Sequence, residues 1–178
     1  MNKIEALKKT IYNLENNTYL YSWHNSDTCN CGILAKTVLN TGKDETLWNY
    51  GIANVPSCTN DRFAAFSKKA HCMTTGIKLP KVFQALKDAG FTFEDVNELE
   101  QCTNLEVLTR MGRKEDRRYH SEKGYYYNPN KSSKWYLIEY LSAWVEILEE
   151  KEKQQLPTVS AVLVTWKGMV EEYPVHAN

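Results

Sequence analysis

The segment from residue 133 to residue 153 constrains the fold more than any other part of this chain. Its apolar residues recur every three or four positions: Ile138, Leu141, Val145 and Leu148, with Trp135 and Trp144 on the flanks. This spacing places the residues on one face of an α-helix. At 178 residues, the chain is long enough to bury such a face in the core of one domain of ordinary size.

Helical patterns also occupy the first half of the chain. A stripe at spacings of three and four predicts a helix over residues 2–16; it consists of Ile4, Leu7, Ile11 and Leu14. The next helix is expected over residues 32–39, with Gly42 just past its C-terminal end. Two shorter helices are predicted, one from Asp44 through Ile52 and one over residues 63–70.

Capping signals divide the middle of the chain. A helix is predicted to begin at Leu79-Pro80 and to end at Gly90, because proline is well tolerated in a first helical turn. Both Thr92 and Thr103 begin segments that look like helix starts, and Thr103-Asn104-Leu105-Glu106 fits the reciprocal capping box directly. The polar, basic and Tyr-rich residues 112–134 are expected to form a long loop.

One strand signal lies near the C-terminus. Residues 158–166 alternate, with Val159, Ala161, Leu163 and Thr165 on one face. A single strand must pair with another edge or with a second copy of the chain, which makes a homodimer a possible state. The predicted fold class is therefore mainly α, a compact multi-helix single domain. Residues 1–155 would form the helical part and residues 156–178 a short C-terminal β element of the same domain.

Composition excludes several classes of partner. The 22 basic and 22 acidic residues cancel, so no net field attracts nucleic acid or an anionic membrane. The start of the chain alternates charged and apolar residues, and the longest apolar run, residues 159–164, is too short to span a bilayer. With five cysteines and no export signal, we expect a reducing, cytoplasmic location, with thiols that are reduced, metal-bound or catalytic.

The block from Trp23 to Leu34 holds the residues best suited to chemistry. His24, Cys29 and Cys31 lie within eight positions, and imidazole and thiolate are the ligands that zinc prefers. Zinc takes four ligands in a structural site. Candidates for the fourth are Cys72, His71 and Cys58. The alternative is that these cysteines are buried thiols that pack as small hydrophobic groups.

A nucleophilic thiol is the second interpretation of this block. Cys31 is predicted at the N-terminal end of a helix, where backbone amides stabilise a thiolate. Cys31-Gly-x-Leu-Ala is similar to the nucleophile position of papain-like peptidases, which implies a thiol-dependent hydrolase or acyl transferase. The base would be His24, His71 or His120, although the strand that normally carries it is not predicted here.

The remaining thiols are less suited to chemistry. A disulfide between Cys29 and Cys31 would be strained, whereas one from either of them to Cys72 would be easier to form. Cys102, at a helix junction, is expected to be an inert, packed thiol. Cys58, in a turn, is expected to have no function.

A basic, Tyr-rich stretch over residues 110–127 is the third candidate site. Its basic residues are Arg110, Arg113, Lys114, Arg117, Arg118, His120 and Lys123, and they precede Tyr125, Tyr126 and Tyr127. Basic side chains interleaved with aromatic rings can bind a phosphate backbone or stack on bases. Three acidic residues dilute the patch, however, so the other interpretation is a solvated loop whose tyrosines pack on the last helix.

The block His24-x4-Cys29-Asn30-Cys31-Gly32 resembles one found in a family of short, uncharacterised bacterial proteins. In that family an aromatic residue precedes the histidine, as Trp23 does here, and a further cysteine follows about forty residues on, as His71-Cys72 does. The turn at residues 89–91 and the helix over residues 135–148 also fit. The similarity covers roughly residues 2–150; the tail after residue 155 and the long Tyr-rich loop depart from the family pattern.

This resemblance implies no activity, but it implies that four residues form one site. They are His24, Cys29, Cys31 and Cys72. Four protein ligands leave no open position on zinc, so a structural Zn2+ site is expected rather than a catalytic one. The protein would then act by binding a small molecule or a protein through its aromatic surface.

Overall fold

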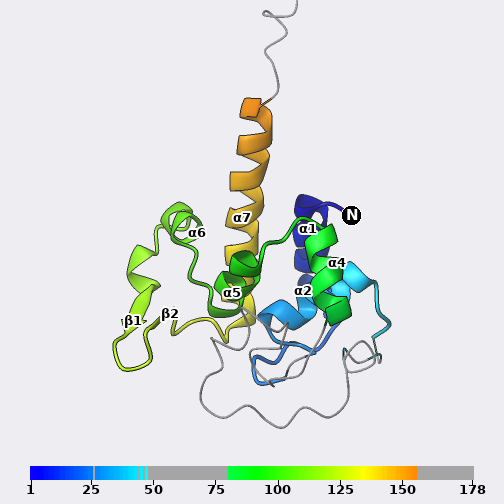
Figure 1. The fold of residues 1–178 in the computed structure, drawn as a ribbon, viewed down its shortest axis with the longest axis horizontal. Helices are drawn as coiled ribbons and strands as arrows, with labels where there is room; N and C mark the ends of the chain where they lie inside the picture. The colour runs from blue at the N-terminus through cyan, green and yellow to red at the C-terminus, as the bar shows by residue number, and fades with distance from the viewer. Residues whose placement is uncertain (26, 44, 46, 48–79, 156–178) are drawn as a thin grey trace, which may run out of the picture.

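The computed structural model describes residues 1–25, 27–43, 45, 47 and 80–155 (Figure 1). Its helices are α1 (Lys3–Glu15), α2 (Asn30–Leu39), α4 (Pro80–Asp88), α5 (Phe93–Gln101), α6 (Leu105–Arg110), the 3-10 helix η2 (Lys114–Asp116) and α7 (Lys134–Gln155). Two strands, β1 (Arg118–His120) and β2 (Tyr125–Tyr127), form an antiparallel hairpin. The prediction of a compact, mainly α fold is confirmed.

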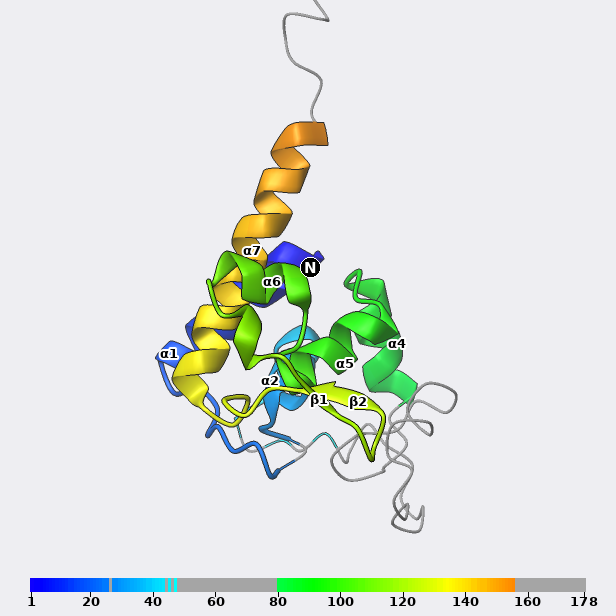
Figure 2. The same cartoon turned by 90° about the vertical axis from the view of Figure 1, so that its left-hand side faces the viewer.

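The long helix α7 is the central element of the fold. It lies against α1 and α6, and its C-terminal end extends beyond the other helices (Figures 1 and 2). Leu137, Tyr140 and Leu141 on its inner face are fully buried, whereas Trp135 is 70% exposed. The predicted stripe is therefore confirmed at its centre, and one of the two predicted flanking tryptophans lies in solvent.

Helices α1 and α2 form the second layer of the core. Asn2 and Glu5 cap the start of α1 reciprocally, since the side chain of each accepts a hydrogen bond of 2.9 Å from the backbone N–H of the other. Leu7 and Leu14 of α1 are buried. The Asn13 amide donates to the Thr37 hydroxyl oxygen at 3.0 Å and so links α1 to α2. Helix α2 also packs on α4 and α5.

Two predicted helix ends differ from the structure. Asn40 ends α2 in the left-handed conformation, with φ at 53°, so Gly42 is not the capping residue; asparagine adopts this conformation more easily than other non-glycine residues. The reciprocal capping box predicted at Thr103 is not observed; one lies instead at Thr92 and Asp95, at the start of α5. At the start of α6, Asn104 rather than Thr103 is the N-cap, because the Asn104 side chain accepts the Val107 N–H at 3.0 Å.

The prediction of a long loop over residues 112–134 is wrong in its centre. Tyr119 pairs with Tyr126 across the hairpin, with ring centroids 5.1 Å apart, and Gly124 makes the turn with φ at +68°. Each strand has three residues, which is too short for alternation to be detected. The strand predicted over residues 158–166 and the helix predicted over residues 63–70 lie outside the described residues, as does the helix predicted over residues 44–52 except for residues 45 and 47. Within the described part of the chain, no helix combines the length and the apolar character needed to cross a bilayer.

We expect Leu141→Ala to lower the free energy of unfolding by about 2–5 kcal/mol, because it leaves a cavity between α7 and its neighbours. Leu141 is 0% exposed. Urea unfolding followed by far-UV circular dichroism measures the change. The control is Trp135→Ala on the same helix, which should change stability by less than about 0.5 kcal/mol because the side chain is exposed. Equal losses in both variants would contradict the assigned core.

Stability should also depend on the ionisation of Asp95. Burial raises the pKa of this carboxyl, but hydrogen bonds from Lys3, at 2.8 Å, and from Thr92 outweigh burial, so the net pKa lies below that of an ordinary aspartate. The stabilisation is therefore present above the unfolded-state pKa and is lost as the pH falls through the lower folded-state pKa. Between about pH 6 and pH 3, the wild type should lose more stability in urea unfolding than Asp95→Asn. Parallel losses would show that the ion pair contributes nothing.

Candidate metal centre

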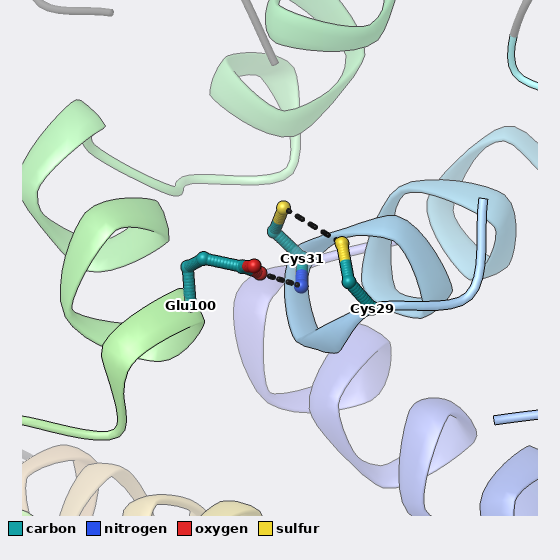
Figure 3. Close-up of side chains that lie close together, drawn as sticks. All are labelled: Cys29, Cys31 and Glu100. Atoms are coloured by element: carbon teal, nitrogen blue, oxygen red, sulfur yellow. Dashed lines mark hydrogen bonds between the residues drawn. The ribbon is translucent and has the colours of Figure 1, made fainter. Parts of the chain in front are cut away.

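Two thiols and one carboxylate meet in the interior of the fold (Figure 3). One ligand atom each from Cys29, Cys31 and Glu100 lie within 4.8 Å of one another. The side chains are 0%, 9% and 1% exposed, respectively. The two sulfurs are 3.6 Å apart, much farther than the roughly 2.05 Å of a disulfide bond. The two cysteines were predicted to share a site, and the structure brings their sulfurs together.

The start of α2 positions both thiols. Cys29 is the N-cap in extended conformation, with ψ at 178°, and its carbonyl accepts the first helical hydrogen bond from Ile33 N–H at 3.0 Å. A turn before it is closed by Cys29 N–H, which donates to the Asn25 carbonyl at 2.7 Å. Cys31 is the second residue of the helix. The predicted placement of Cys31 at a helix N-terminus is therefore confirmed, although α2 begins two residues earlier than predicted.

Glu100 enters the cluster from the last turn of α5. Its Oε2 accepts a hydrogen bond from Cys31 N–H at 3.1 Å (Figure 3). A buried carboxylate is costly unless it is hydrogen-bonded or paired, and the positive end of the α2 dipole stabilises it here. Glu100 was not among the site residues predicted from the sequence. A signal was present, because Val96, Leu99 and Glu100 follow helical spacing and all three are buried.

Asn30 lies between the two cysteines and bonds to the opposite helix. It is 0% exposed. Its amide nitrogen lies 3.1 Å from the Glu100 carbonyl oxygen, 3.3 Å from that of Leu99 and 3.1 Å from that of Lys131. Its Oδ1 accepts a hydrogen bond from the Tyr21 hydroxyl at 2.8 Å. The side chain of Asn30 thus satisfies carbonyl groups at the C-terminal end of α5, where helical partners are lacking.

A cation and an aromatic ring lie beside this network. The Lys131 ammonium donates to Gln101 Oε1 and lies 4.4 Å from the centroid of the Trp23 ring. Burial lowers the pKa of Lys131, and the nearby Glu100 charge opposes that effect. The Trp23 indole N–H donates to the Glu100 carbonyl at 3.4 Å. The carboxylate therefore has a positive charge nearby as well as the end of α2.

The other predicted site residues lie elsewhere. His24 is exposed, with its ring edge-on to Trp23 at a centroid distance of 5.3 Å, and it is not part of the group within 4.8 Å. His120 lies on β1 against the rings of Tyr125 and Tyr127. Cys58, His71 and Cys72 are outside the described residues. The structure thus brings together two of the four residues predicted to form the site and adds Glu100.

Cys102 follows α5 and lies next to the network but outside the cluster. It is 0% exposed, and its sulfur is 3.4 Å from the Asn30 amide nitrogen. Burial raises the pKa of the Cys102 thiol, with the Glu100 charge acting in the same direction. A thiol in this environment stays protonated near neutral pH, which agrees with the prediction of an inert, packed residue.

Several basic residues of the 110–127 stretch make contacts with acidic, aromatic or backbone groups of the protein itself. Arg110 pairs with Glu150, and Arg113 pairs with Glu139 at 2.9 Å. The Arg117 guanidinium lies 3.5 Å from the centroid of the Tyr126 ring and donates to the Thr103 carbonyl at 2.9 Å. Three of the seven basic residues of this stretch, Arg110, Arg113 and Arg117, are therefore engaged with groups of the protein itself.

No known protein family, curated protein or solved structure matches this chain. The chemistry is therefore inferred from the side chains. In a tetrahedral zinc site with Zn–S bonds of about 2.3 Å, two sulfurs lie about 3.8 Å apart. The observed sulfur separation of 3.6 Å is close to that value. Two thiols and a carboxylate are donors that zinc accepts.

We expect the thiols of Cys29, Cys31 and Cys102 to react slowly in the folded protein, because all three are buried. In a Cys58→Ser variant, with the modified residues identified by peptide mass spectrometry, an aromatic disulfide reagent at neutral pH should label these three thiols at least about a hundredfold more slowly than in urea, since reaction requires local opening. One thiol that reacts rapidly, and is lost in a further Cys31→Ser change, would instead support the thiol-enzyme interpretation.

Proposed function

We propose that this protein binds one zinc ion through Cys29, Cys31 and Glu100, and that the ion has a structural role. The observation that carries this proposal is the convergence of three buried donors of the type that zinc prefers, with ligand atoms within 4.8 Å of one another. The ion would fasten the N-terminal end of α2 to the C-terminal end of α5. These two segments are about 70 residues apart in the chain.

Charge supports the proposal. Ionised thiols and a carboxylate that lie this close together in the interior would repel each other, because the interior screens charge weakly. A divalent cation removes this repulsion and converts it into attraction. The binding free energy of such an ion then adds to the stability of the fold.

The fourth ligand is the part of the proposal that rests on sequence. Zinc in structural sites takes four protein ligands, and the predicted set contains Cys72 and His24 in addition to the two clustered cysteines. We propose that Cys72 is the fourth ligand, in addition to Cys29, Cys31 and Glu100. His24 would then remain on the surface, where its ring contacts Trp23.

Burial favours a structural ion over a catalytic one. A catalytic zinc keeps an open position for water or substrate, whereas the three described ligands are 9% exposed or less. The biochemical role would then be binding, in a reducing cytoplasmic compartment, through exposed aromatic residues such as Tyr119 and Tyr126. These two are 57% and 44% exposed.

The test is the zinc content of protein purified without chelator. We expect about one zinc per chain in the wild type, and a loss of most of the metal in Cys29→Ser/Cys31→Ser and in Glu100→Gln. The matched control is Glu98→Gln on the same helix. Glu98 bonds to the Asn104 amide at the start of α6 and is outside the cluster. Mass spectrometry of the metal, with circular dichroism to check folding, gives the result.

Two further variants separate the possible ligand sets. Cys72→Ser should lose zinc and His24→Ala should retain it; the reverse result would replace Cys72 by His24 as the fourth ligand. Wild-type protein that folds but contains and takes up no zinc would contradict the proposal. Zinc retained in both Glu100→Gln and Cys29→Ser/Cys31→Ser would place the ion elsewhere in the chain.

A further inference from the structure

Asn30 is a buried polar residue in the middle of the proposed ligand set. It follows Cys29, precedes Cys31 and is 0% exposed. Its amide nitrogen has four acceptors within 3.4 Å: the carbonyl oxygens of Leu99, Glu100 and Lys131, and the Cys102 sulfur. An amide has two N–H donors, so each N–H of Asn30 has at least one acceptor within reach.

These contacts join the two segments that carry the ligands. The Asn30 amide binds the Glu100 carbonyl at 3.1 Å, while the Glu100 carboxylate accepts Cys31 N–H at 3.1 Å. The two residues therefore cap each other's helix. One bond is donated by Asn30, between the two cysteines, and the other by Cys31 itself. Together they restrain the distance from the Glu100 carboxylate to the two sulfurs.

We infer that Asn30 is the positioning residue of the metal centre, and that its amide N–H groups hold Glu100 in register with Cys29 and Cys31. This inference rests on the proposed zinc function. Groups that orient metal ligands affect affinity by about 10- to 100-fold when they are removed. In this role Asn30 is not a metal ligand. Its amide bonds to the backbone of α5 and so positions the side chain of Glu100.

Asn30→Asp is the sharpest variant, because it keeps the size and shape of the side chain but removes both donors. The new carboxylate oxygen would face three carbonyl oxygens, and α5 should shift away from α2. We expect a loss of zinc affinity of about 10- to 100-fold, measured by competition with a chromogenic chelator. We also expect a changed thiolate-to-metal absorption band after cobalt substitution, which reports the ligand geometry directly.

The matched control is Asn13→Asp on α1. Asn13 is also buried, at 5% exposed, and its amide donates to Thr37 rather than to the site. This control should lose stability but keep the zinc affinity and the cobalt spectrum of the wild type. A second variant, Tyr21→Phe, removes the hydroxyl that donates to Asn30 Oδ1 and leaves the amide donors in place; it should keep most of the affinity.

The outcomes separate the inference from the function on which it rests. Wild-type protein that takes up neither zinc nor cobalt contradicts the proposed function itself. Wild-type protein that binds zinc, together with an Asn30→Asp variant that binds it equally well with the same cobalt spectrum, contradicts only the role of Asn30. If Asn30→Asp does not fold, Asn30→Ser removes the same donors without a new charge and should show the same loss of affinity.

Discussion

The structure depends on the meeting of two helix ends inside the protein. The last carbonyl groups of α5 and the first N–H groups of α2 lack the regular partners of a helix interior, and burying such groups without other partners would cost several kcal/mol. The side chains solve both problems at once: Asn30 donates to the carbonyl of Glu100, and the Glu100 carboxylate accepts Cys31 N–H. Because the negative end of one dipole faces the positive end of the other, the arrangement is also favourable electrostatically.

The rest of the core holds these two ends in place. Helix α1 lies between α7 and α2 in the pattern of contacts, and α2 touches both α4 and α5. The α1–α2 link from Asn13 to Thr37 is itself buried. The thiols are thus carried by a helix that packs on three others, which makes their positions part of the fold rather than of a surface loop. Rigid elements of this kind hold ligands more precisely than loops do.

The sequence predicted the features that depend on local spacing and missed those that depend on distant partners. The stripes of α1 and α7 follow the helical period, so their bounds were predicted to within two residues. Cys29 and Cys31 are close in the chain and were grouped for that reason. Glu100 is 69 residues from Cys31, and only its place beside Leu99 on a buried helical face indicated that it points inward. The β1–β2 hairpin was not predicted, because strands of three residues are too short to show an alternating pattern.

The hydrogen bond from Cys31 N–H to the Glu100 carboxylate bears on whether Cys31 is a nucleophile or a metal ligand. A nucleophilic cysteine at a helix N-terminus needs the backbone N–H groups and a positive surrounding to stabilise its thiolate. Here Cys31 N–H already donates to the Glu100 carboxylate, so this N–H is engaged by another negative group. Negative charge beside a thiolate disfavours ionisation unless a cation binds. The same carboxylate is one of the three donors, with Cys29 and Cys31, that could hold a divalent ion.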